Sequence, residues 1–505
     1  MSKNNAFTGV ARSLSSLIIA FLLIIGFFFF FAKSAEKAWA SPADLFVKPG
    51  GSGSVCTQAQ PCSLDTALSI ASPDAILYLA GGNYTSSEPA VLDLTQNQLI
   101  YGGWDGAATT PVHRDPAAYP TVLDGQNLRR GVMIAGPAAV TLDGLSVKKG
   151  FAEIGGAGLY SQNADLVLRH VIFDSNAVTK TTYTYGGGAW VWGGSLLVDG
   201  CTFLNNTAAS VKASYGGGIV ISETTSAQVQ NSTFNQNYTW WGSAITFFGE
   251  PGAYSDLTLQ NNDFQNQSAG YVGEVYVKDA NAHVERNLIS GAHSSNDYGA
   301  IAFFNSKVDL SRNTITNNWG GRISAVTLSS VDPFTLTNNI IGGNTSAYDW
   351  LKNPAVSVRD SSGKFLNNTI ADNHGAYGVL VDGSSLASFT NTILVSNTVA
   401  ISVSTASTAS LNATLWGGGE WANGMNYGGD GSIDIGTLNY FADPGFVNPV
   451  SRDYHIGQGS GAIDQGVDDG VLVDIDGDPR PQGAGYDIGA DEYSGWKVFL
   501  PFTAK

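Results

Sequence analysis

An internal repeat constrains the fold of this chain more than any other feature of its sequence. A copy begins with an apolar residue, a polar pair that often ends in Asn and a small polar residue, followed by a second apolar residue and a final Asn, which three weaker copies replace with Gly150, Gln267 and Ala292. Ten copies recur at intervals of 24 to 31 residues, with the second apolar position at Val147, Phe173, Phe203, Phe234, Phe264, Ile289, Ile315, Ile341, Ile370 and Leu394. Such a period is typical of proteins built from stacked repeats.

The residues within each repeat predict a coiled β-solenoid. In one copy, residues 189–192, 196–198 and 201–203 alternate in hydrophobicity, and the pairs Gly193-Gly194 and Asp199-Gly200 that separate them suit tight turns. Leucine-rich repeats have a similar length, but their fixed leucine pattern is absent. We expect the final Asn of each unit to form a hydrogen-bonded ladder between coils, which involves Asn176, Asn206, Asn237, Asn318, Asn344, Asn373 and Asn397.

Over roughly residues 44–403 the chain resembles the right-handed parallel β-helix superfamily, the pectate-lyase-like fold. Residues 56–71 and 74–84 look like the short capping helix and first strand of such proteins. The resemblance implies an all-β, right-handed parallel β-helix of about ten or more coils, with a short N-terminal capping helix. Residues 443–448, 474–480 and 486–493 resemble the β-rich end module of bacterial secreted proteins called choice-of-anchor domains, which implies attachment to a cell surface.

The N-terminal residues predict export from the cell. Lys3 and Arg12 precede the apolar run 17–32, and Ala38-Trp39-Ala40 supplies the small residues that a signal peptidase reads. We expect cleavage after Ala40 and a secreted or cell-surface protein; an uncleaved membrane anchor is the alternative. The expected segments are a signal peptide (1–40), an N-terminal cap with first coils (41–140), the repeats (141–405), the end module (406–493) and a tail (494–505). The tail is either a sorting signal or a final edge strand.

Composition and charge exclude two classes of protein. Hydrophobic residues make up 43% of the chain, which is too many for wholesale disorder. The formal net charge of -17 argues against nucleic-acid binding, because neutralising phosphates requires a surface rich in Lys and Arg. We expect contact with a membrane only through the signal peptide or through processing of the tail.

The chain contains three cysteines. Cys56 and Cys62 flank a short polar segment, and in an exported chain they can close a small loop as a disulfide. Cys201 lies in an apolar segment and is expected to be an inert buried thiol.

Aromatic residues recur in two places of the repeat. One set lies just ahead of the glycine turn that opens each unit, and the other alternates outward along the first strand. Flat exposed aromatic rings suit stacking on sugars, so we predict a carbohydrate-binding surface made of Tyr160, Tyr185, Trp190, Trp192, Tyr215, Trp240, Trp241 and Tyr276. The same two patterns include Tyr271, Tyr298 and Phe304. The alternative is that these rings only stack on one another or pack beneath loops.

A second set of polar residues lies near the C-terminus. Asp474, Asp476 and Asp478 are closely spaced in a turn, as carboxylates that bind Ca²⁺ often are. The glutamate that ends a typical calcium loop is missing here. Ca²⁺ is therefore one interpretation, and an ordinary Asp-Gly turn paired with Arg480 is the other. No cofactor is expected to be required.

Motifs for polysaccharide cleavage are absent from the repeats. The Asn-Thr-Asp, Asp-Asp, Gly-His-Gly and Arg-Ile-Lys set of polygalacturonase-like enzymes does not occur on the coils, nor does the arginine motif of pectate lyases. Scattered charged residues can be read either as a convergent site or, more simply, as solvated loop residues: Glu274, Lys278, Asp297, Arg322 and Arg359. We therefore expect a surface protein that binds a polysaccharide or cell-envelope glycan, adheres, or has a structural role. The alternative is a polysaccharide lyase or glycoside hydrolase that acts on an acidic polysaccharide.

Overall fold

The computed structural model describes residues 44–347 and 353–495. The expected signal peptide and all but the first two residues of the expected tail lie outside these ranges. Within them, no helix has the length and apolar character needed to cross a membrane.

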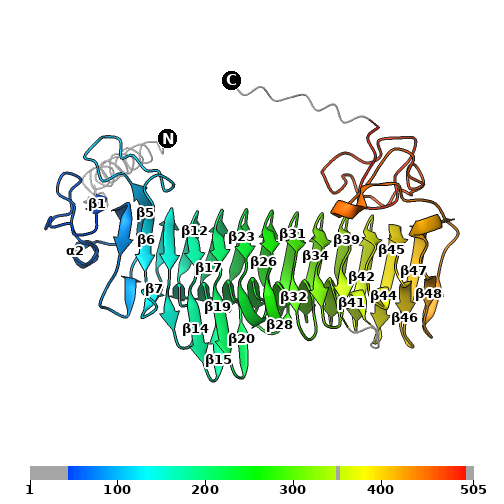
Figure 1. The fold of residues 1–505 in the computed structure, drawn as a ribbon, viewed down its shortest axis with the longest axis horizontal. Coiled ribbons are helices and arrows are strands. Elements are labelled where there is room, and N and C mark those ends of the chain that lie inside the picture. The colour runs from blue at the N-terminus through cyan, green and yellow to red at the C-terminus, as the bar shows by residue number, and fades with distance from the viewer. Residues whose placement is uncertain (1–43, 348–352, 496–505) are drawn as a thin grey trace, which may run out of the picture. The chain divides into compact units, whose positions relative to one another are not determined.

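The described chain is a right-handed parallel β-solenoid, which confirms the expected fold. Its coils follow one another along one axis, and each contributes strands to parallel sheets (Figure 1). A sheet of 13 strands forms one face and therefore contains more coils than the ten recognised in the sequence. Its strands are β4 Ala90–Leu94, β7 Arg130–Ala135, β11 Leu159–Gln162, β16 Ala189–Trp192, β21 Ile219–Ser222, β25 Ile245–Phe248, β29 Val275–Lys278, β33 Ile301–Phe304, β37 Val326–Ser329, β41 Pro354–Arg359, β44 Tyr377–Asp382, β46 Val399–Val403 and β48 Met425–Gly428.

Two further sheets complete the coils. A sheet of 27 short strands carries the repeat motif; in one coil these strands are β17 (Ser195–Asp199) and β18 (Thr202–Leu204). A sheet of ten strands lies between the motif and the glycine turn. It contains β10 Phe151–Ala152, β14 Ala177–Lys180, β15 Tyr183–Tyr185, β19 Thr207–Ser210, β20 Ala213–Tyr215, β24 Tyr238–Trp241, β28 Ser268–Val272, β32 His293–Ser294, β36 Trp319–Gly320 and β40 Thr345–Ser346.

The apolar position of the repeat lies inside the solenoid, as the motif predicts. Phe173, Phe203, Phe234 and Phe264 are fully buried, and their rings stack in sequence with centroids 4.8, 4.7 and 5.1 Å apart. Because each ring lies above its equivalent one coil away, the coils share one continuous core.

The predicted asparagine ladder is present in two runs, Asn176 to Asn237 and Asn318 to Asn373, whereas Asn397 pairs with Asn423 instead of Asn373. The Asn176 side chain donates to Oδ1 of Asn206 over 2.9 Å, and Asn206 donates to Oδ1 of Asn237 over 3.0 Å. In the coil that follows Asn237, Gln267 takes the place of the final Asn. There the backbone N–H of Asn237 donates to the Gln267 side chain. A second ladder, which the sequence analysis did not assign, joins the asparagines that end the polar pair of the motif: Asn262, Asn287, Asn313, Asn339 and Asn368.

The expected capping helix closes the N-terminal end. Helix α2 (Leu64–Ile70) begins after Ser63, whose side chain accepts a hydrogen bond from the Thr66 backbone N–H. Strand β1 (Asp44–Val47) pairs in parallel with β2 (Ala75–Ala80). The Cys56–Cys62 disulfide lies in the loop before the helix. Cys201 is buried as expected, and burial raises the pKa of its thiol to about 12.

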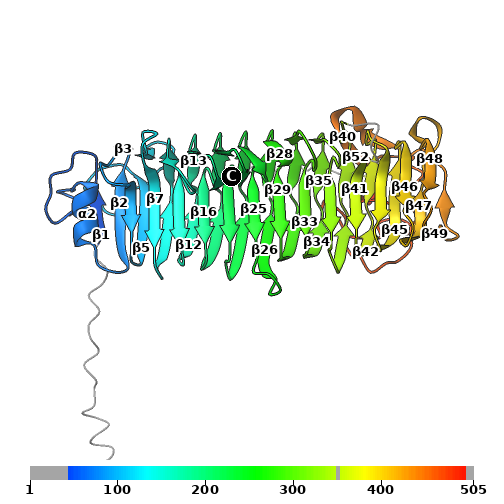
Figure 2. The same ribbon diagram turned by 90° about the horizontal axis from the view of Figure 1, so that it is seen from below.

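The C-terminal end consists of a few last coils and a module that folds back. Parallel pairing continues beyond residue 405, through β47 (Thr408–Leu415) to β50 (Asn439–Tyr440). The module beyond it has one antiparallel pair, β51 (Phe446–Asn448) and β52 (Asp453–Ile456), and is otherwise irregular. It packs beside the late coils (Figures 1 and 2).

Buried polar contacts fix this end module. Arg480 is paired inside it with Glu492, with Nη1 and Oε2 2.9 Å apart and both side chains fully buried. This partner is not one of the loop carboxylates to which the sequence analysis had assigned Arg480. Against the coils, the Asn391 side chain donates to the Val467 carbonyl over 2.7 Å.

Candidate functional site

Aromatic side chains gather on the outer face of the 13-stranded sheet. In β11 and β16, Leu159, Ser161, Ala189 and Val191 point inward and are buried, whereas their neighbours along the strand are half-buried on the outer face. The parallel register places Trp190 beside Tyr160 and Trp192 beside Gln162. Strands β16, β21, β25, β29 and β33 follow one another along this sheet, and all but β21 are labelled in Figure 2.

A second row of rings lies on the ten-stranded sheet, ahead of the glycine turns. Tyr185 stacks on Tyr215 with ring centroids 5.6 Å apart. Tyr215 lies 6.4 Å from Trp241, which stacks in turn on Tyr271 at 5.0 Å. The row therefore spans four successive coils, on strands β15, β20, β24 and β28.

The two rows meet at the turns and form one surface. Tyr185 stacks on Trp190 with centroids 5.0 Å apart, and Trp190 stacks on Trp192 at 6.3 Å. Further along, Trp241 contacts Tyr276 at 5.5 Å. We call this the aromatic surface; its members are Tyr160, Tyr185, Trp190, Trp192, Tyr215, Trp240, Trp241, Phe248, Tyr271, Tyr276, Tyr298 and Phe304.

The structure therefore brings together all eight aromatic residues named from the sequence. Each is half-buried, so each ring packs on its neighbours and still exposes part of its surface. Sequence analysis missed Phe248, which contacts Tyr215 and Tyr276 at 5.2 and 5.7 Å. The signal was available, because Phe248 occupies an alternate outward position of β25, in register with Lys278.

Hydrogen bonds and charge hold several of these rings in place. Nε1 of Trp190 donates to the Ser222 hydroxyl over 3.1 Å, and Nε1 of Trp192 donates to the Glu223 carboxylate over 2.8 Å. The Arg130 guanidinium lies 5.4 Å from the centre of the Tyr160 ring. Burial raises the pKa of Tyr160, as it does for the phenols of Tyr185, Tyr215 and Tyr276, so these groups stay neutral at physiological pH.

A polar groove continues the aromatic surface toward the later coils. It encloses about 490 Å³ beside Tyr298 and is lined by Thr327, Ser329, Arg359 and Asp382, among others. The guanidinium groups near it are paired, since Arg322 Nε lies 3.2 Å from Asp297 and Arg359 Nε 3.7 Å from Asp360.

One charged residue does not lie where sequence analysis placed it. Glu274, expected in a solvated loop, is fully buried immediately before β29. Burial raises the pKa of its carboxyl well above the usual range. It therefore cannot join Lys278 and Arg322 on the outer face.

The aspartates for which Ca²⁺ was considered form a tight turn. The buried Asp474 accepts backbone hydrogen bonds from Asp476, Gly477 and Asp478 at one oxygen, over 3.0, 2.9 and 2.8 Å, and from Glu492 at the other. Ca²⁺ binding by Asp474, Asp476 and Asp478 stays a prediction.

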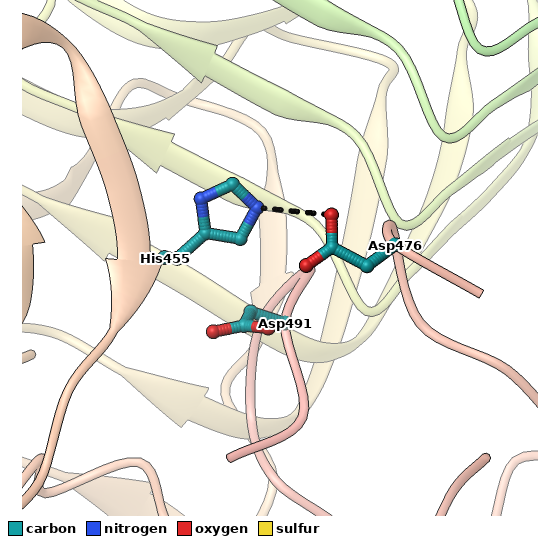
Figure 3. A group of neighbouring side chains, drawn as sticks. All are labelled: His455, Asp476 and Asp491. Atoms are coloured by element: carbon teal, nitrogen blue, oxygen red, sulfur yellow. Dashed lines mark ion pairs between the residues drawn. The ribbon is translucent and has the colours of Figure 1, made fainter. Parts of the chain in front are cut away.

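Asp476 instead faces a histidine of the end module (Figure 3). Its Oδ1 lies 3.7 Å from Nε2 of His455, and Asp491 is the third member of this group. Burial would lower the pKa of His455, but the carboxylates of Asp476 and Asp453 outweigh it and raise the pKa to about 9. Burial raises the pKa of Asp491 to about 6. Sequence analysis did not detect this group.

The solved structures to which this chain is similar include proteins that are described with different activities. A pectate lyase, Pel9A, is 15% identical over 90% of this chain and 98% of its own, with a TM-score of 0.36. PfbA, a surface adhesin of Streptococcus pneumoniae, is 12% identical over 73% of this chain and 84% of its own, with a TM-score of 0.25. Among curated proteins, none matches this sequence.

A family model gives the stronger result. The model described as the right handed beta helix region matches residues 125–289 and 255–415. These two matches together cover more than half of the chain. The chain therefore belongs to the right-handed β-helix family.

Proposed function

We propose that this protein binds a polysaccharide or cell-envelope glycan along the aromatic surface. The observation that carries the proposal is the continuity of half-exposed rings over successive coils, from Tyr160 on β11 to Phe304 on β33. Strand β21 carries no ring, and Tyr215 of the second row bridges this coil through contacts to Tyr185 and Phe248. Sugar rings present apolar C–H faces that stack on such planes, and strands repeat about every 4.8 Å along the surface. A glycan chain could therefore contact several coils at once.

The fixed orientation of the rings supports this proposal. Trp190 and Trp192 are held by hydrogen bonds to Ser222 and Glu223, so binding would cost little side-chain entropy. Aromatic side chains that are already rigid are favoured at binding sites for this reason.

The charges beside the surface favour a neutral glycan over a polyuronate. Lys278, Arg322 and Arg359 each lie within 4.0 Å of a carboxylate, which offsets their positive charge. Apart from Arg130, which lies against the Tyr160 ring, these cations are offset, so an acidic sugar would meet little excess positive charge here. Export to the cell exterior, where such a glycan is found, is part of the same proposal. It rests on the predicted signal peptide and is consistent with the Cys56–Cys62 disulfide.

The test is the double variant Trp190→Ala with Trp192→Ala. Each lost stacking contact is worth about 0.5–1.5 kcal/mol, so loss of two should raise Kd for a retained polysaccharide roughly 5- to 140-fold. Affinity electrophoresis or calorimetry would measure the change.

Phe441→Ala is the matched control, because Phe441 is an aromatic residue with 66% exposure outside the aromatic surface. Circular dichroism would establish that all variants remain folded. Equal retention by the double variant and the wild-type protein would rule out the aromatic surface as the binding site.

A further inference from the structure

We propose that the end module binds one divalent transition-metal ion of the Zn²⁺ class through His455, Asp476 and Asp491. The three side chains come from separate segments: strand β52, the turn at residues 474–478 and the last described segment. In Figure 3, His455 and Asp476 face each other and Asp491 lies beside them. One ligand atom of each lies within 4.8 Å of the other two.

The distance between His455 and Asp476 suits two ligands of one ion better than a hydrogen bond between the two side chains. Nε2 of His455 is buried, finds no hydrogen-bond partner among the described residues, and lies 3.7 Å from Oδ1 of Asp476. That separation is too long for a hydrogen bond. Two metal bonds of about 2.0–2.1 Å at a tetrahedral angle place their ligand atoms about 3.3 Å apart. A shift of a few tenths of an ångström would therefore complete the pair.

The surrounding contacts orient these ligands. Nδ1 of His455 lies 2.6 Å from Oδ1 of Asp453 and donates a hydrogen bond to it, so Nε2 is the nitrogen left for the ion, which would take the place of the proton that the imidazolium carries there. One oxygen of Asp491 accepts the backbone N–H of Ile456 over 2.9 Å, which holds this carboxylate beside the ring. A carboxylate behind the metal-binding histidine is a common feature of zinc sites.

An ion could enter the group and keep solvent ligands. A cavity of about 500 Å³ is lined by all three residues, together with Asp453 and Tyr493. Asp491 is only 5% exposed, so its carboxylate lies at the inner side of this cavity. Three protein ligands with a remaining position for water match the coordination of many zinc sites.

The chemistry of the ligands selects the ion. An imidazole nitrogen suits Zn²⁺ and related transition metals, whereas Ca²⁺ takes six to eight oxygens. Asp474, the neighbouring carboxylate, already accepts backbone hydrogen bonds at both oxygens. This site therefore differs from the calcium loop considered from the sequence, although both include Asp476.

The ion would join parts of the end module that have no shared sheet. The segment that holds Asp491 also contacts the coils, where the Ala490 backbone N–H donates to the Thr369 hydroxyl over 3.1 Å. Because the ion would bind only the folded module, it would stabilise the module and its attachment to the coils.

The first experiment measures Zn²⁺ binding by calorimetry, with the untagged full chain treated with chelator and then dialysed. We expect one saturable site per chain, displaced little by millimolar Ca²⁺. His455→Gln should weaken binding at least 100-fold, and Asp453→Asn, a change at a positioning residue, about 10- to 100-fold.

His374→Gln is the matched control. His374 also has Nε2 3.7 Å from an aspartate oxygen, but its side chain is 61% exposed and it is not part of the group. Its variant should bind Zn²⁺ as the wild-type protein does. Equal losses in the His374 and His455 variants, absence of saturable binding, or tighter binding of Ca²⁺ than of Zn²⁺ would each overturn the proposal.

A second measurement, on the wild-type protein, tests the proposed metal site even if the His455 variant fails to fold. X-ray absorption of the Zn²⁺-loaded protein should show nitrogen and oxygen ligands at about 2.0–2.1 Å, with the scattering of one imidazole. A spectrum without an imidazole ligand would contradict the assignment.

Discussion

Glu274 is the residue whose position departs most from the repeat. Immediately before the first strand of each coil, neighbouring coils have Gly218, Ala244 and Ala300, whereas this coil has a glutamate. Its side chain is fully buried, and neither carboxyl oxygen has a hydrogen-bond partner among the described residues. A charged carboxylate would be costly there, so burial favours the neutral acid and raises the pKa of this carboxyl in the folded protein.

This burial predicts a pH dependence of stability. Below the ordinary pKa of 4.5, Glu274 is protonated in both the folded and the unfolded chain. Above it the unfolded chain ionises first, so the free energy of unfolding falls as pH rises toward the folded pKa. Glu274→Gln should remove this contribution. The variant's stability relative to wild type should increase by up to about 1.4 kcal/mol per pH unit in that window.

Urea unfolding at several pH values would measure this difference. Glu250→Gln is the control, because Glu250 is exposed and its replacement should give a difference that does not vary with pH. A flat difference for Glu274→Gln as well would show that this carboxyl ionises in the folded protein.

Single residues were predictable where the repeat fixed their environment. The buried phenylalanines and the terminal asparagines occupy the same position in each copy, so one motif describes them all. A glutamate stands at this position in only one of the coils compared above, and a residue in a turn is not part of a hydrophobic pattern that would indicate burial. His455 and Asp491 lie 36 positions apart in a module without a period, so only the folded chain brings them together.

At the scale of elements, the asparagine ladder links each coil to the next. Asn206 donates to Asn237 and to the Phe173 carbonyl over 3.0 and 2.9 Å, and its Oδ1 accepts from Asn176. The second ladder had a signal in the sequence, because the polar pair of the motif often ends in Asn. We did not predict this ladder from the sequence, because asparagines in exposed turns produce the same sequence pattern.

Asn206→Ala should destabilise the solenoid by roughly 2–4 kcal/mol, because the Phe173 carbonyl loses the side-chain amide that donates to it and the buried Asn176 backbone N–H loses its acceptor. Denaturant unfolding followed by circular dichroism would measure the loss. Asn83→Ala, at an exposed position of β3 (Gly82–Tyr84), is the control and should have little effect. Similar losses for both variants would argue against a stabilising ladder.

The whole described molecule is a stack with different ends. Helix α2 and strand β1 close the first coils, while the end module packs beside the last ones. Stacked coils need such protection because their terminal strands expose unpaired backbone groups. The repeat predicted the stack from sequence alone, but the placement of the end module depends on contacts such as Asn391 to Val467, which no periodicity encodes.

Stacking also sets the form of the aromatic surface. Rings that recur once per coil become neighbours only when successive coils are in register, as Tyr185 and Tyr215 are. A long ligand could then be held by several weak contacts in line, which suits a polysaccharide better than a single sugar.

The most direct test of this account measures binding and cleavage in one experiment. The purified protein would be incubated with a panel of plant, algal and bacterial polysaccharides, with and without Ca²⁺, and both bound protein and released saccharide would be quantified. We expect saturable binding to at least one neutral polysaccharide without release of saccharide. Release of saccharide, above all of unsaturated oligouronides, or absence of binding across the panel would contradict it.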